Sequence, residues 1–476
     1  MIEGRTRVPC PLRSAALESP DARAVVGAGW SITYGELDAR VSAAERRLED
    51  LGVSPGDRVA LYLPKGVGYL VLLLALVRAG AVACPVSARL PAGGVGPLLG
   101  RADCSALIST EEELSGSVGG IDVLDPQAAL GGEEDERASG PLEVPLGRPA
   151  TVVFTSGSTG APKAALHTFG NHYFSALGSN ANIALAAGDR WLHSLPLYHV
   201  GGLSIVFRCL ISGAAIALPG PDAPLGRSIT DLRATHVSLV STQLLRLLRE
   251  DAALEGLKAV LTGGGPVPED LVDEALARGL PVHASYGLTE MASQVTTTAP
   301  GAAPEELRTA GRVLPHREVS VSREGEILVR GETLFAGYVQ GRKTVRPAGA
   351  GGWFRTGDLG RLDGAGRLRV LGRRDNLFVS GGENVMPEEI EVALLRIPGV
   401  EEAVVVPVPD PEFGARPVAF VRLSGGVGDL ARALEPVLPR FKIPKTFHEW
   451  EGAGGMKPDR VVLRERANRM AGDAAS

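Results

Sequence analysis

The sequence predicts an α/β protein: a large N-terminal domain of α/β subdomains plus a β-rich subdomain, with a small mobile α+β C-terminal domain. Strand and helix signals alternate over the first 130 residues and again from about residue 185 to residue 290, which is typical of βαβ units and a parallel sheet. From about Leu307, short β segments separated by turns replace this alternation, and a further mixture of helices and strands ends the chain. We therefore expect an N-terminal domain of residues 1–374 and a C-terminal domain of residues 375–476.

The first elements each have a local signal. Thr33-Tyr-Gly-Glu36 has the spacing of a capping box and opens a helical pattern that runs through Leu51. The acidic, turn-rich segment 131–140 is expected to be a loop between subdomains. Apolar runs predict a buried helix at Gly66–Arg78 and strands at Asp57–Leu63, Ala81–Val86 and Thr151–Phe154.

Two later strands end in loops of small or polar residues. Lys258–Thr262 runs into Gly263-Gly-Gly265, and Pro281–Ser285 runs into Tyr286-Gly-Leu-Thr-Glu290. Ligands of open α/β sheets bind at the carboxyl ends of the strands, so these loops predict one side of a binding site. The neighbouring elements are expected to be strand-like runs within Leu185–Leu197 and at Ala214–Leu218, and helices at Pro268–Arg278 and at Ser241–Arg249, with Ser241 or Thr242 as its cap.

The remaining elements belong to the β-rich subdomain and the C-terminal domain. Strands are expected at Arg317–Ser322, Glu326–Arg330 and Arg367–Leu371. The C-terminal domain is expected to contain helices at Pro387–Leu395 and Val427–Leu438 and strands at Ala403–Pro407 and Pro417–Leu423.

The composition excludes several classes of protein. Asp and Glu (55) outnumber Lys and Arg (49), so the net charge is −6 and non-specific nucleic-acid binding is not expected. The four Cys, at 10, 84, 104 and 209, show no CxxC pairing or metal-ligand spacing, which argues against disulfides or zinc and fits a reducing cytoplasm. The longest apolar run, residues 67–77, is too short to span a bilayer, and the N-terminus lacks a signal peptide's apolar core. We expect a cytoplasmic protein without a membrane partner.

The strongest chemical motif is Thr155-Ser-Gly-Ser-Thr-Gly-Ala-Pro-Lys163, which follows a strand. Glycines let backbone N–H groups approach phosphate oxygens, hydroxyls donate further hydrogen bonds, and lysine adds a positive charge. The string lacks the GxxxxGK[ST] pattern of a Walker A loop, and a flexible surface turn is the alternative interpretation. The candidate phosphate-binding residues are Thr155, Ser156, Gly157, Ser158, Thr159, Gly160 and Lys163.

This string resembles the phosphate loop of the adenylate-forming superfamily of acyl-CoA synthetases, peptide-synthetase adenylation domains and luciferases. The resemblance covers nearly the whole chain, because further motifs follow in the family's order. They are Tyr286–Glu290 (adenine and magnesium), Arg355-Thr-Gly-Asp358 (ribose), Gly372-Arg-Arg-Asp375 (hinge) and Gly381-Gly-Glu-Asn384 (start of the C-terminal domain). A narrower resemblance, to the o-succinylbenzoate–CoA ligases of menaquinone biosynthesis, lies in residues 167–172, 195–202, 237–245 and 286–294.

The resemblance implies a nucleotide site. Asp358 would accept hydrogen bonds from both ribose hydroxyls, Tyr286 would offer its ring to adenine, and Glu290 would bind Mg²⁺. Without the resemblance, Asp358 would be interpreted as a turn residue and Tyr286 as an aromatic residue of the core. The other residues expected in this site are Gly263, Gly264, Gly265, Gly287, Thr289 and Arg373.

Four residues are expected beside the acyl substrate: His199, Arg208, Gln243 and Gln294. Arg208 lies in an apolar stretch and therefore needs an anionic partner. A structural ion pair and the second carboxylate of o-succinylbenzoate are the two alternatives. For His199 the alternatives are a structural histidine and a catalytic residue beside the acyl carboxylate.

The resemblance implies a two-step reaction that uses ATP, Mg²⁺ and coenzyme A. The substrate carboxylate attacks the α-phosphorus of ATP and pyrophosphate leaves. The C-terminal domain then rotates about Asp375, and the CoA thiol displaces AMP. Lys457 is the expected catalytic lysine of the first step, with Lys445 as its competitor and a surface lysine as the alternative. Gly381 and Gly382 are expected to face CoA in the second step.

The expected function is an ATP-dependent acid–CoA ligase whose substrate is a small carboxylic acid, most like o-succinylbenzoate. Another aryl- or fatty-acid–CoA ligase of the superfamily is one alternative. A nucleotide-binding protein without turnover is the other, because Ala164 and the Gly-Met-Lys457 context depart from the family pattern. The oligomeric state is not predicted.

Overall fold

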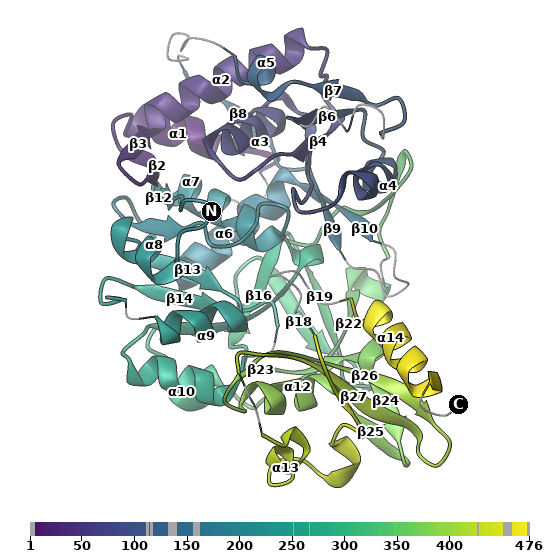
Figure 1. Cartoon of the computed structure of the whole chain (residues 1–476). Helices are drawn as coiled ribbons and strands as arrows, with labels where there is room; N and C mark the ends of the chain where they lie inside the picture. Colours follow the sequence, from purple (N-terminus) through teal and green to yellow (C-terminus); the bar gives the residue numbers. More distant parts are fainter. Residues whose placement is uncertain are drawn as a thin grey trace.

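The computed structural model describes residues 5–110, 114, 118–131, 140–155, 162–250, 252–265, 267–347, 349–425, 428–450 and 459–473. Figure 1 shows two large mixed sheets with helices packed against them, a smaller β-rich part, and a C-terminal part in yellow-green at one end. The predicted α/β class with a small α+β C-terminal unit is confirmed.

The first large sheet carries the candidate phosphate loop. β9 and β10 pair as an antiparallel hairpin in which Thr155 lies opposite Lys163, so both ends of the loop leave the sheet together. The strands from β9 to β7 are parallel, and β10, β20 and β21 are antiparallel to their neighbours. In sheet order the strands are β21 (Lys343–Val345), β20 (Gly337–Gln340), β10 (Lys163–Thr168), β9 (Pro149–Thr155), β5 (Val82–Pro85), β4 (Arg58–Tyr62), β6 (Ala106–Ser109) and β7 (Asp122–Leu124).

The second large sheet carries the candidate adenine segment. Its strands are parallel from β15 to β2. In sheet order they are β17 (Arg312–Val313), β16 (Ser293–Thr297), β15 (Val282–Leu288), β14 (Ala259–Thr262), β13 (His236–Leu239), β11 (Arg190–Leu192), β12 (Ala215–Ala217), β2 (Arg23–Gly27) and β3 (Trp30–Thr33). The prediction that a strand ends at Ser285 is wrong, because pairing with β16 extends β15 through Leu288.

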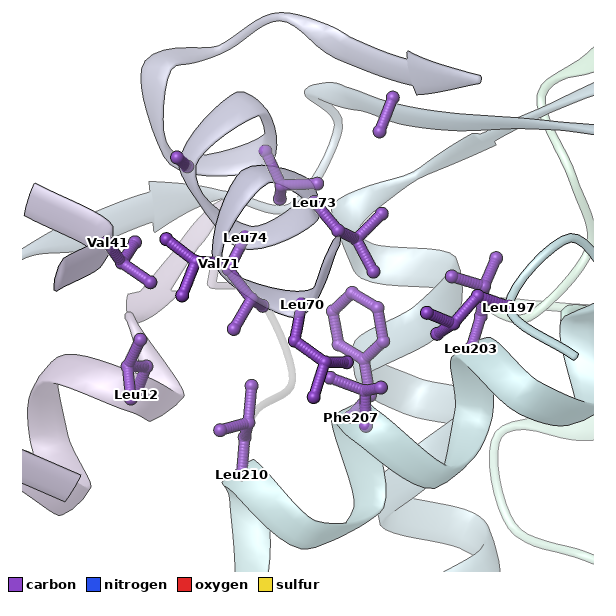
Figure 2. Close-up of a cluster of buried hydrophobic side chains, with 14 of the residues drawn as sticks. Leu12, Val41, Leu70, Val71, Leu73, Leu74, Leu197, Leu203, Phe207 and Leu210 are labelled. Atoms are coloured by element: carbon purple, nitrogen blue, oxygen red, sulfur yellow. The ribbon is translucent and has the colours of Figure 1, made fainter. Parts of the chain in front are cut away.

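The helices of the part that contains the two large sheets follow the predicted signals closely. The capping box is confirmed: Thr33 Oγ1 accepts the Glu36 N–H and Glu36 Oε2 accepts the Thr33 N–H. The apolar run forms α3, whose leucines pack against α7 in the core between the sheets (Figure 2). The helices are α1 (Pro11–Glu18), α2 (Tyr34–Asp50), α3 (Val67–Ala79), α4 (Ala92–Ala102), α5 (Pro126–Leu130), α6 (Phe169–Asn182), α7 (Val200–Ser212), α8 (Leu225–Asp231), α9 (Ser241–Arg249), α10 (Glu269–Ala277) and α11 (Pro304–Leu307).

The β-rich part is an antiparallel sheet that leads into the C-terminal part. Its strands are β18 (Arg317–Val321), β19 (Glu326–Gly331), β22 (Phe354–Leu362) and β23 (Leu368–Arg373), and the 3₁₀ turn η4 (Arg374–Asn376) follows it. The C-terminal part has apolar clusters of its own. Its elements are β24 (Phe378–Ser380), β25 (Glu383–Val385), α12 (Pro387–Leu395), β26 (Val400–Asp410), β27 (Gly414–Leu423), α13 (Leu430–Leu434), β28 (Phe447–Glu449) and α14 (Arg460–Asp473). A short ladder pairs β1 (Arg7–Pro9) with β8 (Glu143–Pro145).

Two further predictions are corrected. The helix expected at 427–438 is only α13, because Asp429 caps its start and Pro436 has no N–H to continue the helical hydrogen bonds. The strand-like run expected within 185–197 is confirmed as β11. The cap of α9 is Val240, whose N–H donates to Gln243 Oε1 at 3.1 Å, and Ser241 is already helical. Most of the loop expected at 131–140 lies outside the described residues.

The four cysteines are buried free thiols. None of the described helices combines the length and the apolar character that a membrane span requires.

Candidate active site

One large cavity, of about 2720 Å³, brings most of the candidate residues together. It lies where segments following the parallel strands of both sheets meet the β-rich part and α12. The candidates that line it are Thr155, Lys163, His199, Arg208, Gln243, Gly263, Gly264, Gly265, Tyr286, Gly287, Thr289, Glu290, Gln294, Asp358, Arg373 and Asp375.

The remaining candidates fall into two groups. Ser156, Gly157, Ser158, Thr159, Gly160 and Lys457 are outside the described residues. Gly381 and Gly382 form the turn between β24 and β25, with φ of +59° and +86°, and are not among the residues that line the cavity. A two-residue hairpin of this kind requires positive φ at both positions, which glycine adopts without strain.

The ribose candidate Asp358 is a buried carboxylate with a protein partner on each oxygen. Tyr286 donates its phenol proton to Oδ2 at 2.6 Å, and Arg373 donates Nη1–H to Oδ1 at 3.1 Å. The contact joins β15 to the antiparallel pair β22–β23, in which Asp358 lies opposite Arg373. Burial and the Asp358 charge both raise the pKa of Tyr286, so its phenol stays protonated and donates.

Glycine is required at position 263 because its loop packs closely against Ser285, the residue before the adenine candidate Tyr286. A Cβ built on Gly263 would lie 2.6 Å from Ser285 Oγ, whose hydroxyl donates to the Thr262 carbonyl at 2.8 Å. Gly264 has φ of +82°, a left-handed conformation that favours glycine. The loop after β14 therefore runs close to β15 and leaves its backbone along the cavity.

Glu290 lies in the 3₁₀ turn η2 (Thr289–Met291) and faces Tyr338 of β20. Tyr338 donates its phenol proton to Glu290 Oε1 at 2.5 Å, and Lys163 Nζ lies 5.2 Å from the centre of the Tyr338 ring. Burial, followed by the Glu290 charge, raises the pKa of Tyr338. The candidate metal carboxylate and the phosphate-loop lysine therefore both contact one tyrosine, the first at its hydroxyl and the second at its ring.

His167 holds the same turn through a hydrogen bond to its backbone. Its Nε2 lies 2.7 Å from the Thr289 carbonyl oxygen, so Nε2 carries the proton and donates it. The ring is fully buried, and this burial lowers its pKa to about 4, so the imidazole is neutral. β10 thus carries both Lys163 and a support for the turn of Glu290.

Arg208 lies on α7, is 1% exposed, and reaches the cavity without a carboxylate partner among the described residues. Nη2 donates to Gln294 Oε1 at 2.7 Å and to Ser293 Oγ at 3.1 Å, and the guanidinium lies over the Trp191 ring. Burial lowers its pKa to about 9. The alternative of a structural ion pair finds no support here, since these partners are neutral.

The other three acyl candidates are already engaged within the chain. Gln294 holds Arg208 and donates Nε2–H to Thr297 Oγ1 at 2.6 Å. Gln243 caps α9 and donates to the Ser194 carbonyl at 3.3 Å. His199 is exposed at the N-cap of α7, with its ring 4.7 Å from that of Tyr198.

A second cavity, of about 440 Å³, separates α9 and α10 from residues 395–401. Its three arginines are all paired: Arg249 with Glu401, Arg278 with Glu274 and Arg396 with Asp270. This cavity therefore offers no unpaired charge to a ligand.

Three residues of the site were not predicted from the sequence: Tyr338, His167 and Glu326. Glu326 lines the large cavity and contacts Arg355 and Arg374. One signal was available for His167, because residues four apart on a strand share a face, and Lys163 is four residues earlier. No local pattern singles out Tyr338, since its contact with Glu290 comes from strand pairing.

Comparison with known proteins identifies the family of the chain. The AMP-binding enzyme family matches residues 12–339, and the AMP-binding enzyme C-terminal domain matches residues 389–452. A 2-succinylbenzoate–CoA ligase from Geobacillus kaustophilus is 35% identical over 461 residues, which covers 93% of this chain and 94% of the relative.

Solved structures of o-succinylbenzoate CoA synthetase also resemble this chain. The o-succinylbenzoate CoA synthetase from Bacillus subtilis in complex with the acyl-adenylate intermediate OSB-AMP has a TM-score of 0.86 and 31% identity, covering 97% of this chain and 98% of that one. Its complex with ATP and magnesium ion has a TM-score of 0.86 and 32% identity, covering 97% and 99%.

Proposed function

The chain belongs to the AMP-binding enzyme family as an adenylate-forming acid–CoA ligase, and we propose that its acid is o-succinylbenzoate. The observation that carries this proposal is Arg208, a buried guanidinium on the cavity wall whose described partners are neutral. A buried cation of this kind favours a substrate that brings a second carboxylate. The ligases and synthetases that the chain resembles along nearly its whole length are named for that dicarboxylate.

We assign the nucleotide to the part of the cavity around Tyr286 and Asp358. Asp358 is held by Tyr286 and Arg373 and retains acceptor capacity for ribose hydroxyls, since a carboxylate accepts about four hydrogen bonds. Tyr286 and the glycine loop after β14 would border adenine. Lys163, with the hydroxyls and N–H groups of residues 155–160, would bind phosphate.

Glu290 is the candidate ligand for Mg²⁺. Mg²⁺ is typically bound through one or two carboxylates together with substrate phosphates and water, so a single carboxylate beside the phosphate-loop lysine suits it. When bound, the ion would offset charge on the phosphate oxygens. Tyr338 holds Oε1 of Glu290, and His167 fixes the carbonyl of the preceding residue.

The proposed reaction then has two steps. The substrate carboxylate attacks the α-phosphorus and pyrophosphate leaves, with Lys457 placed between the two anions and His199 beside the acyl group. The C-terminal domain, residues 375–476, then turns about Asp375, which is exposed in the 3₁₀ turn η4 between β23 and β24. The turn of Gly381 and Gly382 would face CoA, whose thiol attacks the acyl carbon and displaces AMP.

A substrate panel tests this proposal. The chain is incubated with ATP, Mg²⁺, CoA and one acid, and AMP release and the thioester are measured. The acids are o-succinylbenzoate, its two analogues that each lack one carboxylate, benzoate and a medium-chain fatty acid. We expect o-succinylbenzoate to exceed every monocarboxylate in kcat/KM by at least 100-fold. A preference for benzoate or the fatty acid would assign another ligase specificity.

A further inference from the structure

Glu326 is a buried carboxylate outside the roles assigned so far. It opens β19, lines the large cavity, and its side chain is 1% exposed. Oε1 accepts the Gly357 N–H at 3.0 Å. Oε2 accepts from Arg374 Nη1 at 2.9 Å and from Arg355 Nη2.

These three donors come from two segments that also hold the ribose candidate. Gly357 immediately precedes Asp358, and Arg374 immediately follows Arg373, the partner of Asp358 Oδ1. Glu326 therefore makes a second link between β22 and the end of β23, in addition to the Asp358–Arg373 contact. Gly357 has φ of +74° and lies in the part of β22 where the register with β19 shifts, so its N–H bond to Glu326 stabilises this irregular stretch of the strand.

Because Glu326 is buried and the two arginines are not, the carboxylate depends on this contact more than they do. A carboxylate removed from water is costly unless its charge is met by donors, whereas Arg355 and Arg374 are 55% and 51% exposed and remain solvated. The need for a partner is therefore mainly on the side of Glu326, and the arginines adapt to it. Arg374 is also the residue directly before Asp375, the proposed pivot.

We propose that Glu326 is a positioning residue for both half-reactions: it fixes residues 355–358 for ribose binding and anchors Arg374, so that rotation begins at Asp375. The anchoring part of this inference rests on the proposed pivot. The ribose part depends only on nucleotide binding.

Glu326→Gln is the central variant, because it keeps the shape and one oxygen but removes the charge. We expect the Kd for AMP, measured by calorimetry, to rise about tenfold. We also expect thioester formation from supplied acyl-adenylate and CoA to slow about tenfold. Glu318→Gln is the matched control, since Glu318 pairs with Arg330 on the exposed side of the same sheet.

Two arginine variants separate the two effects and remain informative if Glu326→Gln unfolds, because both side chains are half exposed. Arg355→Met is expected to raise the Kd for AMP and leave the thioester step within twofold. Arg374→Met is expected to slow the thioester step and leave the Kd within twofold. A change in melting temperature alone, with AMP affinity and both half-reactions as in the unmodified chain, would overturn the proposal. If another acid proves to be the substrate, the calorimetric arm still decides the ribose part.

Discussion

Tyr286 donates a hydrogen bond to Asp358 Oδ2 at 2.6 Å across the boundary between the second large sheet and the β-rich part. With Arg373 on Oδ1, this carboxylate is oriented before any nucleotide arrives. Binding of a ligand therefore does not have to order the Asp358 side chain, so no conformational entropy is lost there and binding is favoured.

Tyr286→Phe is the first prediction, because it keeps the ring and removes only the donor. Asp358 then loses one charge-assisted hydrogen bond, and we expect the Kd for AMP to rise roughly tenfold, or about 1.4 kcal/mol. Calorimetric titration with AMP measures this.

Tyr34→Phe is the control for that variant. The Tyr34 phenol is buried and donates to the Ala214 and Cys209 carbonyls, away from the cavity. It should lower thermal stability and leave AMP affinity unchanged. Equal AMP affinities for Tyr286→Phe and the parent chain would remove the phenol from nucleotide binding.

Arg208→Met is the second prediction. The variant removes a buried cation, and we expect kcat/KM for o-succinylbenzoate to fall about 100-fold, in line with the cost of truncating one member of a buried charged pair. Activity with the monocarboxylate analogues should change less than about threefold. Gln294→Leu should give an intermediate loss, since Gln294 only holds the Arg208 guanidinium.

Arg190→Met serves as the matched control in that series. Arg190 lies on β11, donates to the Leu232 carbonyl at 2.8 Å and does not line the cavity. Selectivity between dicarboxylate and monocarboxylate should be the same as in the parent chain. A similar loss with every acid in Arg208→Met would instead assign Arg208 a structural role.

The sequence predicts the parts of the fold that depend on nearby residues. The bounds of α12 were predicted as found, because Pro387 fits the first helical turn and an apolar periodicity follows it. The capping box at Thr33 is equally local. The length of β15 was not predictable in this way, since its last residues are strand only through pairing with β16.

The same division holds for the site. Motifs that are continuous in the chain, such as 286–290 and 355–358, could be found and line one cavity. Tyr338 could not, because it reaches Glu290 through the pairing of β20 with β10, which are distant in sequence. The role of Gln294 was also hidden, because its amide is committed to Arg208 and Thr297 by the tertiary fold.

The third prediction concerns stability at low pH. His193 is fully buried, and burial, with a further contribution from the Lys65 charge, lowers its pKa to about 3. The unfolded chain has an ordinary histidine pKa of about 6.5. Below that value the unfolded state binds more protons, so the free energy of unfolding falls as the pH drops from about 6.5 towards 3.

Urea unfolding at pH 7.5 and at pH 5.0 checks this. At pH 5.0 the proton on unfolded His193 accounts for about 2 kcal/mol of the loss. His193→Leu should therefore lose about 2 kcal/mol less than the parent chain between the two pH values. His448→Leu, at a partly exposed position, should change this difference less. Identical pH losses for the parent chain and His193→Leu would contradict the prediction.

The last prediction identifies the lysine of the first half-reaction. The C-terminal domain contains Lys442, Lys445 and Lys457. In the part of it that the structure describes, Lys442 donates to Glu389 at 2.5 Å and Lys445 donates to Asp410 at 3.1 Å. Both ammonium groups are neutralised by carboxylates of their own domain, which makes them poor candidates for a charge that must bridge two substrate anions.

Lys457→Ala should slow adenylate formation, measured by ATP–pyrophosphate exchange, by about 100- to 1000-fold. Thioester formation from supplied acyl-adenylate should stay within about threefold, because the proposed rotation would remove this residue from the site. Lys445→Ala should leave both half-reactions unchanged, and an equal loss of both in Lys457→Ala would rule out a role confined to the first.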